Sequence, residues 1–135
     1  MHVHGKNDRH VAYGGGTIAV TATASLSFAP VETTIENWRN FLHCPTEPTL
    51  STKQKVPVRL ELLRGGDQGI DHNVYSGCDG GTRVESFITG DGHVFPRGST
   101  TEVKEGIRWA SGLDVAPEIV RFFAEAFSSQ QAAGL

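Results

Sequence analysis

The chain has neither a long apolar run nor a strong excess of one charge. Its 135 residues carry a formal net charge of −3, so the composition does not favour nucleic acid or an anionic membrane as a partner. No stretch approaches the roughly 20 consecutive apolar residues that span a bilayer. The run Thr17–Ala29 is made of small residues and is interrupted by threonine and serine, which favours a loop or a short strand.

Cysteine is scarce, and a secretory signal is missing from the opening of the chain. Cys44 and Cys78 are the only cysteines, and two cysteines do not establish a redox compartment. The chain opens on residues 1–4 without the charged and apolar regions of a signal peptide, so the localisation stays unknown. The abrupt opening on a strand-like segment indicates a loss upstream. The length predicts a single domain, residues 1–135.

Two helices are predicted from apolar periodicity and capping residues. The first covers residues 31–42, with Thr33 and Glu36 at the spacing of a capping box. The last opens at Asp114 as an acidic cap, and residues 128–135 are expected to fray. We expect the apolar stripes of both helices to be mostly buried against a sheet. These stripes include Trp38, Phe41, Ile119, Phe122 and Phe123.

Strands are predicted where apolar residues form short or alternating runs. They cover residues 1–5, 56–63, 70–75 and 82–88. The last two flank Cys78 and a pair of glycines, which is typical of a hairpin. Residues 45–55 are polar and rich in proline and predict a loop, as do residues 97–112 around Trp109.

Two segments far apart in the chain each place a titratable residue just past a strand-like run. Residues 4–16 carry Asp8 three positions after the first strand, and residues 88–98 carry His93. Two glycines before His93 let the backbone turn sharply. Taken alone, Asp8 is more readily interpreted as a turn-forming residue than as a catalytic acid, and His93 can be interpreted as an exposed loop histidine.

Together these segments resemble the esterase family that includes poly(3-hydroxybutyrate) depolymerases and feruloyl or acetylxylan esterases. The acid segment of that family reads roughly His-Gly-x-x-Asp-x-x-Val-x-Tyr-x-Gly-Gly. The matching residues here are His4, Gly5, Asp8, Val11, Tyr13, Gly15 and Gly16. The family's histidine segment reads Gly-Gly-His-x-Trp-Pro-Gly, and the matches are Gly92, His93 and Pro96. Phe95 replaces the tryptophan, and Asp91 and Arg97 replace glycines.

The resemblance covers most of the chain except about residues 17–30 and 50–68. It includes a helix that carries a tryptophan and ends near a cysteine, a Tyr-x-x-Cys-x-x-Gly-x-x-Val hairpin at residues 75–84, and the last helix. It implies an α/β fold class: a partial α/β-hydrolase sheet, the C-terminal half, with two flanking helices and a hairpin. It also implies that Cys44 and Cys78 face each other in a disulfide, although two small buried thiols fit the sequence as well.

Catalytic residues of an α/β-hydrolase come in the chain order Ser, acid, His, each at the C-terminal tip of a strand. The resemblance implies that Asp8 is the acid that orients the imidazole and that His93 is the base. The two side chains are therefore expected within hydrogen-bond reach of each other. The nucleophile is missing, because the chain contains no Gly-x-Ser-x-Gly elbow. Elbow context is lacking at Ser25, Ser27, Ser76, Ser86, Ser99 and Ser111.

The histidines near the start allow a rival interpretation, a zinc site. His2 and His4 alternate along a strand and therefore point to one face. With Asp8 and His10 they resemble the His-x-His-x-Asp-His ligand set, but three residues rather than one separate His4 from Asp8. The glycine triplet 14–16 lacks the Gly-Lys-Ser or Gly-Lys-Thr of a phosphate loop. The sequence therefore predicts no metal and no cofactor.

Two functions follow from these patterns. The first is the C-terminal portion of a carboxylic ester or polyester hydrolase, inactive alone because its serine comes from elsewhere. The second is a non-catalytic remnant or binding protein, since a fold does not carry its function with it. Half of a doubly wound sheet leaves an edge and apolar faces uncovered, so a homo-oligomer is expected. Neither nucleic acid nor a membrane is expected as a partner.

Overall fold

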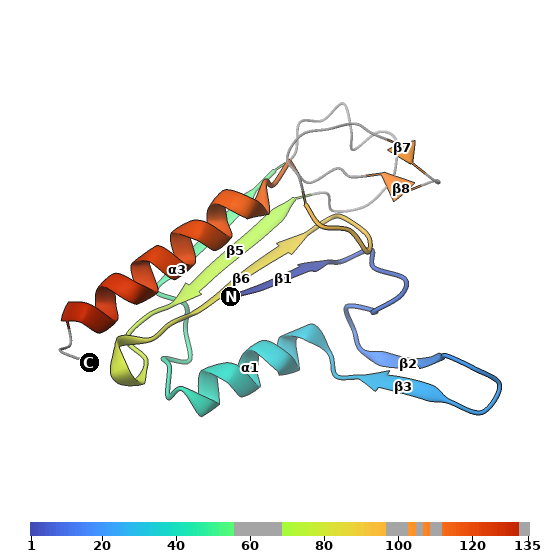
Figure 1. The fold of residues 1–135 in the computed structure, drawn as a ribbon, viewed down its shortest axis with the longest axis horizontal. Helices are drawn as coiled ribbons and strands as arrows, with labels where there is room; N and C mark the ends of the chain where they lie inside the picture. Colours follow the sequence, from blue (N-terminus) through green and yellow to red (C-terminus); the bar gives the residue numbers. More distant parts are fainter. Residues whose placement is uncertain (56–68, 97–102, 105–106, 109–111, 133–135) are drawn as a thin grey trace.

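The computed structural model of the protein describes residues 1–55, 69–96, 103–104, 107–108 and 112–132. A four-stranded sheet lies at its centre, in the strand order β1-β6-β5-β4 (Figure 1). Its strands are β1 (His2–Gly5), β4 (Leu50–Gln54), β5 (Ile70–Tyr75) and β6 (Val84–Thr89). β1 runs parallel to β6, whereas β5 is antiparallel to both β6 and β4. The fold is therefore mixed α/β, as the sequence predicts at that level.

Two small hairpins accompany the sheet. One pairs β2 (Gly16–Ala19) with β3 (Ser25–Phe28) and projects away from the sheet (Figure 1). It occupies the run for which the sequence allows a short strand. The other pairs β7 (Val103–Lys104) with β8 (Ile107–Arg108). The predicted strand at residues 56–63 and Trp109 lie outside the described residues.

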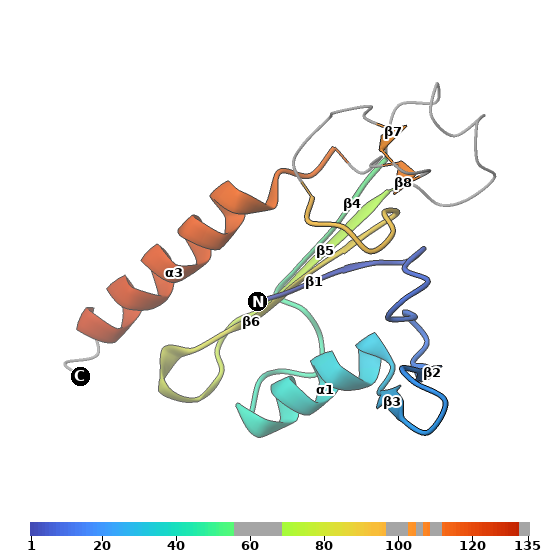
Figure 2. The ribbon, with the colours of Figure 1, turned by 45° about the vertical axis from the view of Figure 1, so that its right-hand side comes forward.

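Two α-helices of the described part of the chain, α1 (Val31–Phe41) and α3 (Val115–Ala132), lie on opposite faces of the sheet (Figure 2). β6 contributes core side chains to both faces of the sheet, because successive side chains of a strand point to opposite sides. Val84 and Ile88 pack with Val31 and Ile35 of α1. Phe87 packs on the other face in a cluster with Val115. Among the described residues, no helix combines the length and apolar character needed to cross a bilayer.

The start of both helices and the end of the first are predicted to within one residue, since α1 spans Val31–Phe41 and α3 begins at Val115. The capping box is wrong: α1 begins at Val31 after Pro30, with no side-chain cap bond. The cap at Asp114 is confirmed, since the Ala116 amide donates to Asp114 Oδ1 at 3.2 Å. The expected fraying of residues 128–135 is wrong through Ala132, where α3 ends.

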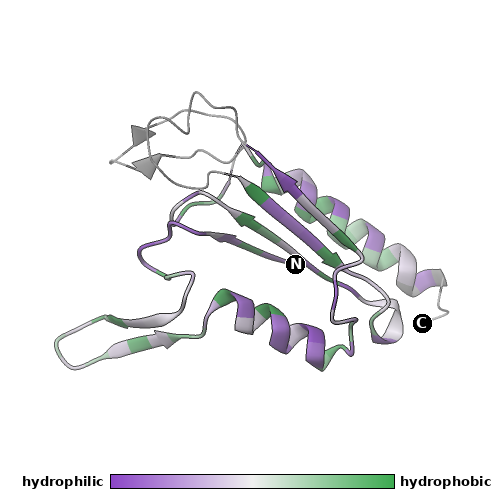
Figure 3. Cartoon of the chain, turned by 180° about the vertical axis from the view of Figure 1, so that it is seen from behind, coloured by the Kyte–Doolittle hydropathy of each residue, from purple (hydrophilic) through white to green (hydrophobic). Residues whose placement is uncertain are grey.

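The burial predicted for the helix stripes is wrong at three positions. Trp38, Phe41 and Phe123 are 55%, 74% and 65% exposed, while Ile119 and Phe122 are half-buried. Apolar and polar residues alternate along both helices (Figure 3). However, α1 buries only Val31 and Ile35 on its inward side.

The loop predicted for residues 45–55 is wrong at Leu50–Gln54, because β4 forms there and pairs with β5. All five residues of β4 are exposed. An edge strand without a buried face has no apolar alternation, so the sequence lacks the signal that identifies a strand.

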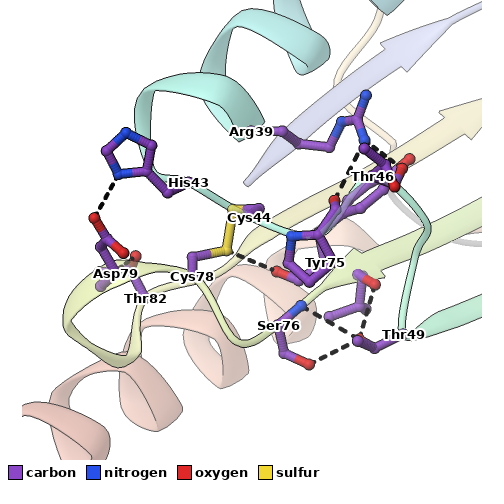
Figure 4. Close-up of a disulfide and its surroundings, with 12 residues drawn as sticks. Arg39, His43, Cys44, Thr46, Thr49, Tyr75, Ser76, Cys78, Asp79 and Thr82 are labelled. Carbon is purple, nitrogen blue, oxygen red and sulfur yellow. Dashed lines mark hydrogen bonds and ion pairs between the residues drawn. A yellow bond between two sulfur atoms is a disulfide. The ribbon is translucent and has the colours of Figure 1, made fainter.

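Cys44 and Cys78 form a disulfide, which confirms the pairing that the family resemblance implies. The bond ties the end of α1 to the turn between β5 and β6 (Figure 4). Two further contacts join the same segments: the Asp79 amide donates to the Leu42 carbonyl at 2.9 Å, and His43 Nδ1 lies 2.5 Å from Asp79 Oδ2. This end of the sheet is thus held covalently.

Glu85 anchors α3 to the face of the sheet opposite α1. Its side chain is fully buried in β6. The carboxylate accepts a hydrogen bond from Arg121 of α3, and His72 Nε2 lies 2.7 Å from Glu85 Oε1. A buried carboxylate needs such partners to offset its desolvation. The Arg121–Glu85 ion pair therefore helps to fix the position of α3, whose apolar side chains Val120, Phe123 and Phe127 remain exposed.

Candidate functional site

Parallel pairing brings the C-terminal ends of β1 and β6 side by side. The Lys6 amide donates to the Thr89 carbonyl at 2.7 Å, and the Asn7 amide donates to the Asp91 carbonyl at 3.1 Å. The Asn7 side-chain amide donates to the Gly90 carbonyl at 2.6 Å. These bonds continue the contact beyond the strands, and they place the loops that carry Asp8 and His93 together.

Gly5 is needed where the two loops approach each other. A Cβ at this position would lie 2.2 Å from the Asp91 carbonyl oxygen and 2.6 Å from that of Gly92. Real Cβ atoms do not come this close to backbone oxygens, so any larger residue would push the loops apart. This gives a physical reason for the glycine after His4 in the motif.

Asp8 is a buried carboxylate, and both of its oxygens have hydrogen-bond partners. Oδ1 accepts hydrogen bonds from the amides of His10 and Val11, both at 2.8 Å. Oδ2 lies 2.8 Å from His93 Nδ1. Burial alone raises the pKa of Asp8, but the bonds from Val11, His93 and His10 outweigh it and lower that pKa below its usual value. The carboxylate is therefore ionised at neutral pH.

His93 contacts Asp8 as predicted, so their expected proximity is confirmed. The imidazole side chain is 56% exposed, whereas that of Asp8 is 6% exposed. Because an ionised carboxylate only accepts hydrogen bonds, Nδ1 carries the proton. Nε2 is then the nitrogen left to accept a proton from another group. An orienting acid behind a base with a free nitrogen is the arrangement needed for general base catalysis.

A cleft of about 420 Å³ lies beside the pair. Polar groups in its lining include His4, Asp8 and His93, and apolar walls come from Val11, Phe95 and Pro96. A mostly apolar cleft with a few convergent polar groups is typical of small-molecule sites.

Tyr13 and Gly15 connect the motif to α1. The Val31 amide donates to the Tyr13 carbonyl at 3.0 Å, and the Tyr13 hydroxyl donates to Glu32. Gly15 has a φ of 75° and leaves no room for a Cβ beside Pro30. These contacts fix the start of α1 relative to the loop that carries Asp8.

No serine among the described residues contacts the Asp8–His93 pair. Ser25 and Ser27 lie in β3, and Ser86 is buried in β6. Ser76 bonds to Thr49 next to Tyr75, which pairs with Val84 at the other end of the sheet. Ser99 and Ser111 lie outside the described residues.

The histidines of the rival zinc interpretation divide into two groups. His2 and His4 do share a face, with ring centroids 5.7 Å apart. His4 Nε2 donates to the Val11 carbonyl at 2.9 Å and lies 3.9 Å from Asp8 Oδ2. His10 instead lies against His93, with ring centroids 5.2 Å apart. The sequence did not predict this second contact, because it depends on the parallel pairing of β1 and β6.

No family model, curated protein or solved structure matches the chain. The resemblance to serine esterases therefore depends on the motif residues themselves and on their placement in the fold.

Proposed function

We propose that this chain provides the acid and the base of a serine carboxylic ester hydrolase, on a sheet that corresponds to the C-terminal half of an α/β-hydrolase. The observation that carries the proposal is the 2.8 Å contact between Asp8 and His93. The two residues follow adjacent parallel strands in the chain order acid, then histidine, which is the order of that fold.

In this mechanism His93 Nε2 takes the proton of a serine hydroxyl as the serine attacks the ester carbonyl. It then returns the proton to the leaving alcohol. Asp8 keeps the proton on Nδ1 and stabilises the imidazolium that forms. The serine and the oxyanion hole come from a polypeptide segment outside this sequence. The isolated chain is thus expected to be inactive toward acyl esters and polyesters.

The test begins with the gene, where we expect an in-frame Gly-x-Ser-x-Gly upstream of Met1 or a neighbouring gene that encodes it. The chain is then expressed together with that segment and exposed to a fluorophosphonate and to p-nitrophenyl butyrate. We expect labelling of the elbow serine and ester hydrolysis. His93→Ala should lower kcat by at least about 10³-fold, because removing a triad member leaves only residual catalysis.

His43→Ala is the matched control, since His43 also contacts a carboxylate but lies away from the cleft. It should leave hydrolysis unchanged. Labelling of a serine within this chain that persists after His93→Ala would contradict the proposal. So would the absence of any elbow segment that restores activity.

A second candidate function, a non-catalytic protein that self-associates, is favoured by two observations. β1 forms one edge of the four-stranded sheet. In addition, Val120, Phe123 and Phe127 are more than 60% exposed along one side of α3. We propose that a second copy covers these surfaces, since exposed edges and apolar stripes promote association. Sedimentation velocity over a range of concentrations tests this, and a monomer at every concentration would contradict it.

A further inference from the structure

Asp8, His10 and His93 place three potential metal ligands in one small volume. One ligand atom from each lies within 4.8 Å of the others. The sequence pattern groups His10 with His2, His4 and Asp8, whereas the fold brings it against His93, which follows the neighbouring strand β6. Two imidazoles and one carboxylate form a ligand set suited to Zn²⁺ and similar divalent transition metals.

The carboxylate is already organised for such a role. Asp8 is buried, and its Oδ1 is held by the amides of His10 and Val11, which leaves Oδ2 directed at the imidazoles. Backbone bonds of this kind orient a ligating carboxylate and are typical of the groups that surround a metal. The loop that orients Asp8 is also the loop that carries His10.

The two imidazoles have the freedom to complete the site. In tetrahedral Zn²⁺ sites, bonds of about 2.0–2.1 Å place ligand atoms about 3.3 Å apart. The three ligand atoms here lie within 4.8 Å of one another, so the widest spacing must close by up to about 1.5 Å. The 2.8 Å pair of Asp8 Oδ2 and His93 Nδ1 must open by about 0.5 Å. Both His10 and His93 are exposed, and exposed side chains change rotamer at low cost.

From this geometry we infer that Asp8, His10 and His93 bind one Zn²⁺ ion, with the remaining coordination positions open to water or to a ligand in the cleft. The ion would take Asp8 Oδ2 and a nitrogen of His93. It would therefore compete with the hydrogen bond between these residues, and metal binding and base catalysis would be alternative states. The inference does not depend on ester hydrolysis, since it requires neither a serine nor a substrate.

Isothermal titration of the isolated chain with ZnCl₂ tests the site. The protein is prepared without a histidine tag and with the Cys44–Cys78 disulfide intact, so that neither a tag nor thiols bind the ion. We expect saturable binding of one ion per chain. His10→Ala should weaken the affinity by about tenfold or more, while circular dichroism shows an unchanged fold, because His10 is exposed.

Two further variants distinguish this site from other histidine pairs. His43→Ala removes an exposed histidine beside Asp79, and His2→Ala removes the partner of His4 on β1. Both should bind Zn²⁺ as the unchanged chain does. Absence of saturable binding would overturn the inference, as would a His10→Ala affinity equal to that of the unchanged chain. An equal loss in His2→Ala or His43→Ala would also overturn it, because it would place the ion elsewhere.

Discussion

The two ends of the sheet each carry a histidine paired with an aspartate, yet the pairs differ in their surroundings. At one end His93 contacts Asp8, whose side chain is 6% exposed and held by two backbone amides. At the other end His43 contacts Asp79, and both side chains are more than 70% exposed. The first pair borders a cleft, whereas the second lies beside a disulfide (Figure 4).

This difference shows that contact alone does not make a candidate site. An exposed ion pair contributes about 0–1 kcal/mol and is screened by water and salt. A buried carboxylate keeps its charge only where hydrogen bonds offset the loss of water. Asp8 meets that condition through its own loop. The Asp79 end gains its order from the Cys44–Cys78 bond instead.

The largest expected effect comes from breaking the disulfide end. The two bonded cysteines lie 34 positions apart in the sequence, and the chain-entropy model gives a stabilisation of about 3–4 kcal/mol for a loop of that size. Cys44→Ala combined with Cys78→Ala should lower the free energy of unfolding by that amount in urea titrations. An unchanged urea midpoint would contradict this account of the disulfide end.

The next largest effect should come from Gly5→Ala at the Asp8 end. The added methyl overlaps the Asp91 carbonyl oxygen, and overpacking of this kind costs about 1–3 kcal/mol. Gly14→Ala is the matched control, because a Cβ there meets nothing within 4 Å. Chemical denaturation of both variants measures the difference. Equal stabilities would show that the two loops approach less closely than described.

The smallest of these stability effects should be the pH dependence contributed by Asp8. Its pKa is lower in the folded chain than in the unfolded chain. The stabilisation is therefore present above the unfolded pKa of about 3.9 and is lost as the pH falls through the folded pKa. Asp8→Asn should lower stability at pH 7 by roughly 1–2 kcal/mol and flatten the loss of stability below about pH 5.

Asp79→Asn is the control for that measurement, since it alters the exposed pair. Its effect on stability at pH 7 should stay within about 0.5 kcal/mol. Denaturation curves from pH 2 to 7 compare the two variants. A steeper loss of stability at acid pH in Asp8→Asn than in the unchanged chain would contradict the stabilising role of the Asp8 carboxylate.

The sequence was informative wherever local patterns coincide with the fold. The hairpin of β5 and β6, the first helix and the cap at Asp114 follow from periodicity and turn residues. The Asp8–His93 contact was predicted only from the resemblance to serine-esterase motifs, because no local pattern in the sequence shows that β1 pairs with β6. β4 could not be found, because an exposed polar edge strand resembles a loop. The exposure of Trp38 depends on how α1 docks, and the contact of His10 with His93 depends on tertiary structure alone.

The protonation of His93 tests the central claim, that Asp8 orients a catalytic imidazole, most directly. Imidazole ¹⁵N–¹H correlation spectra of the folded chain at neutral pH give the tautomer of each histidine. The account predicts that His93 carries its proton on Nδ1, with a downfield resonance that disappears in Asp8→Asn and persists in Asp79→Asn. A His93 protonated on Nε2, or a spectrum unchanged by Asp8→Asn, would contradict it.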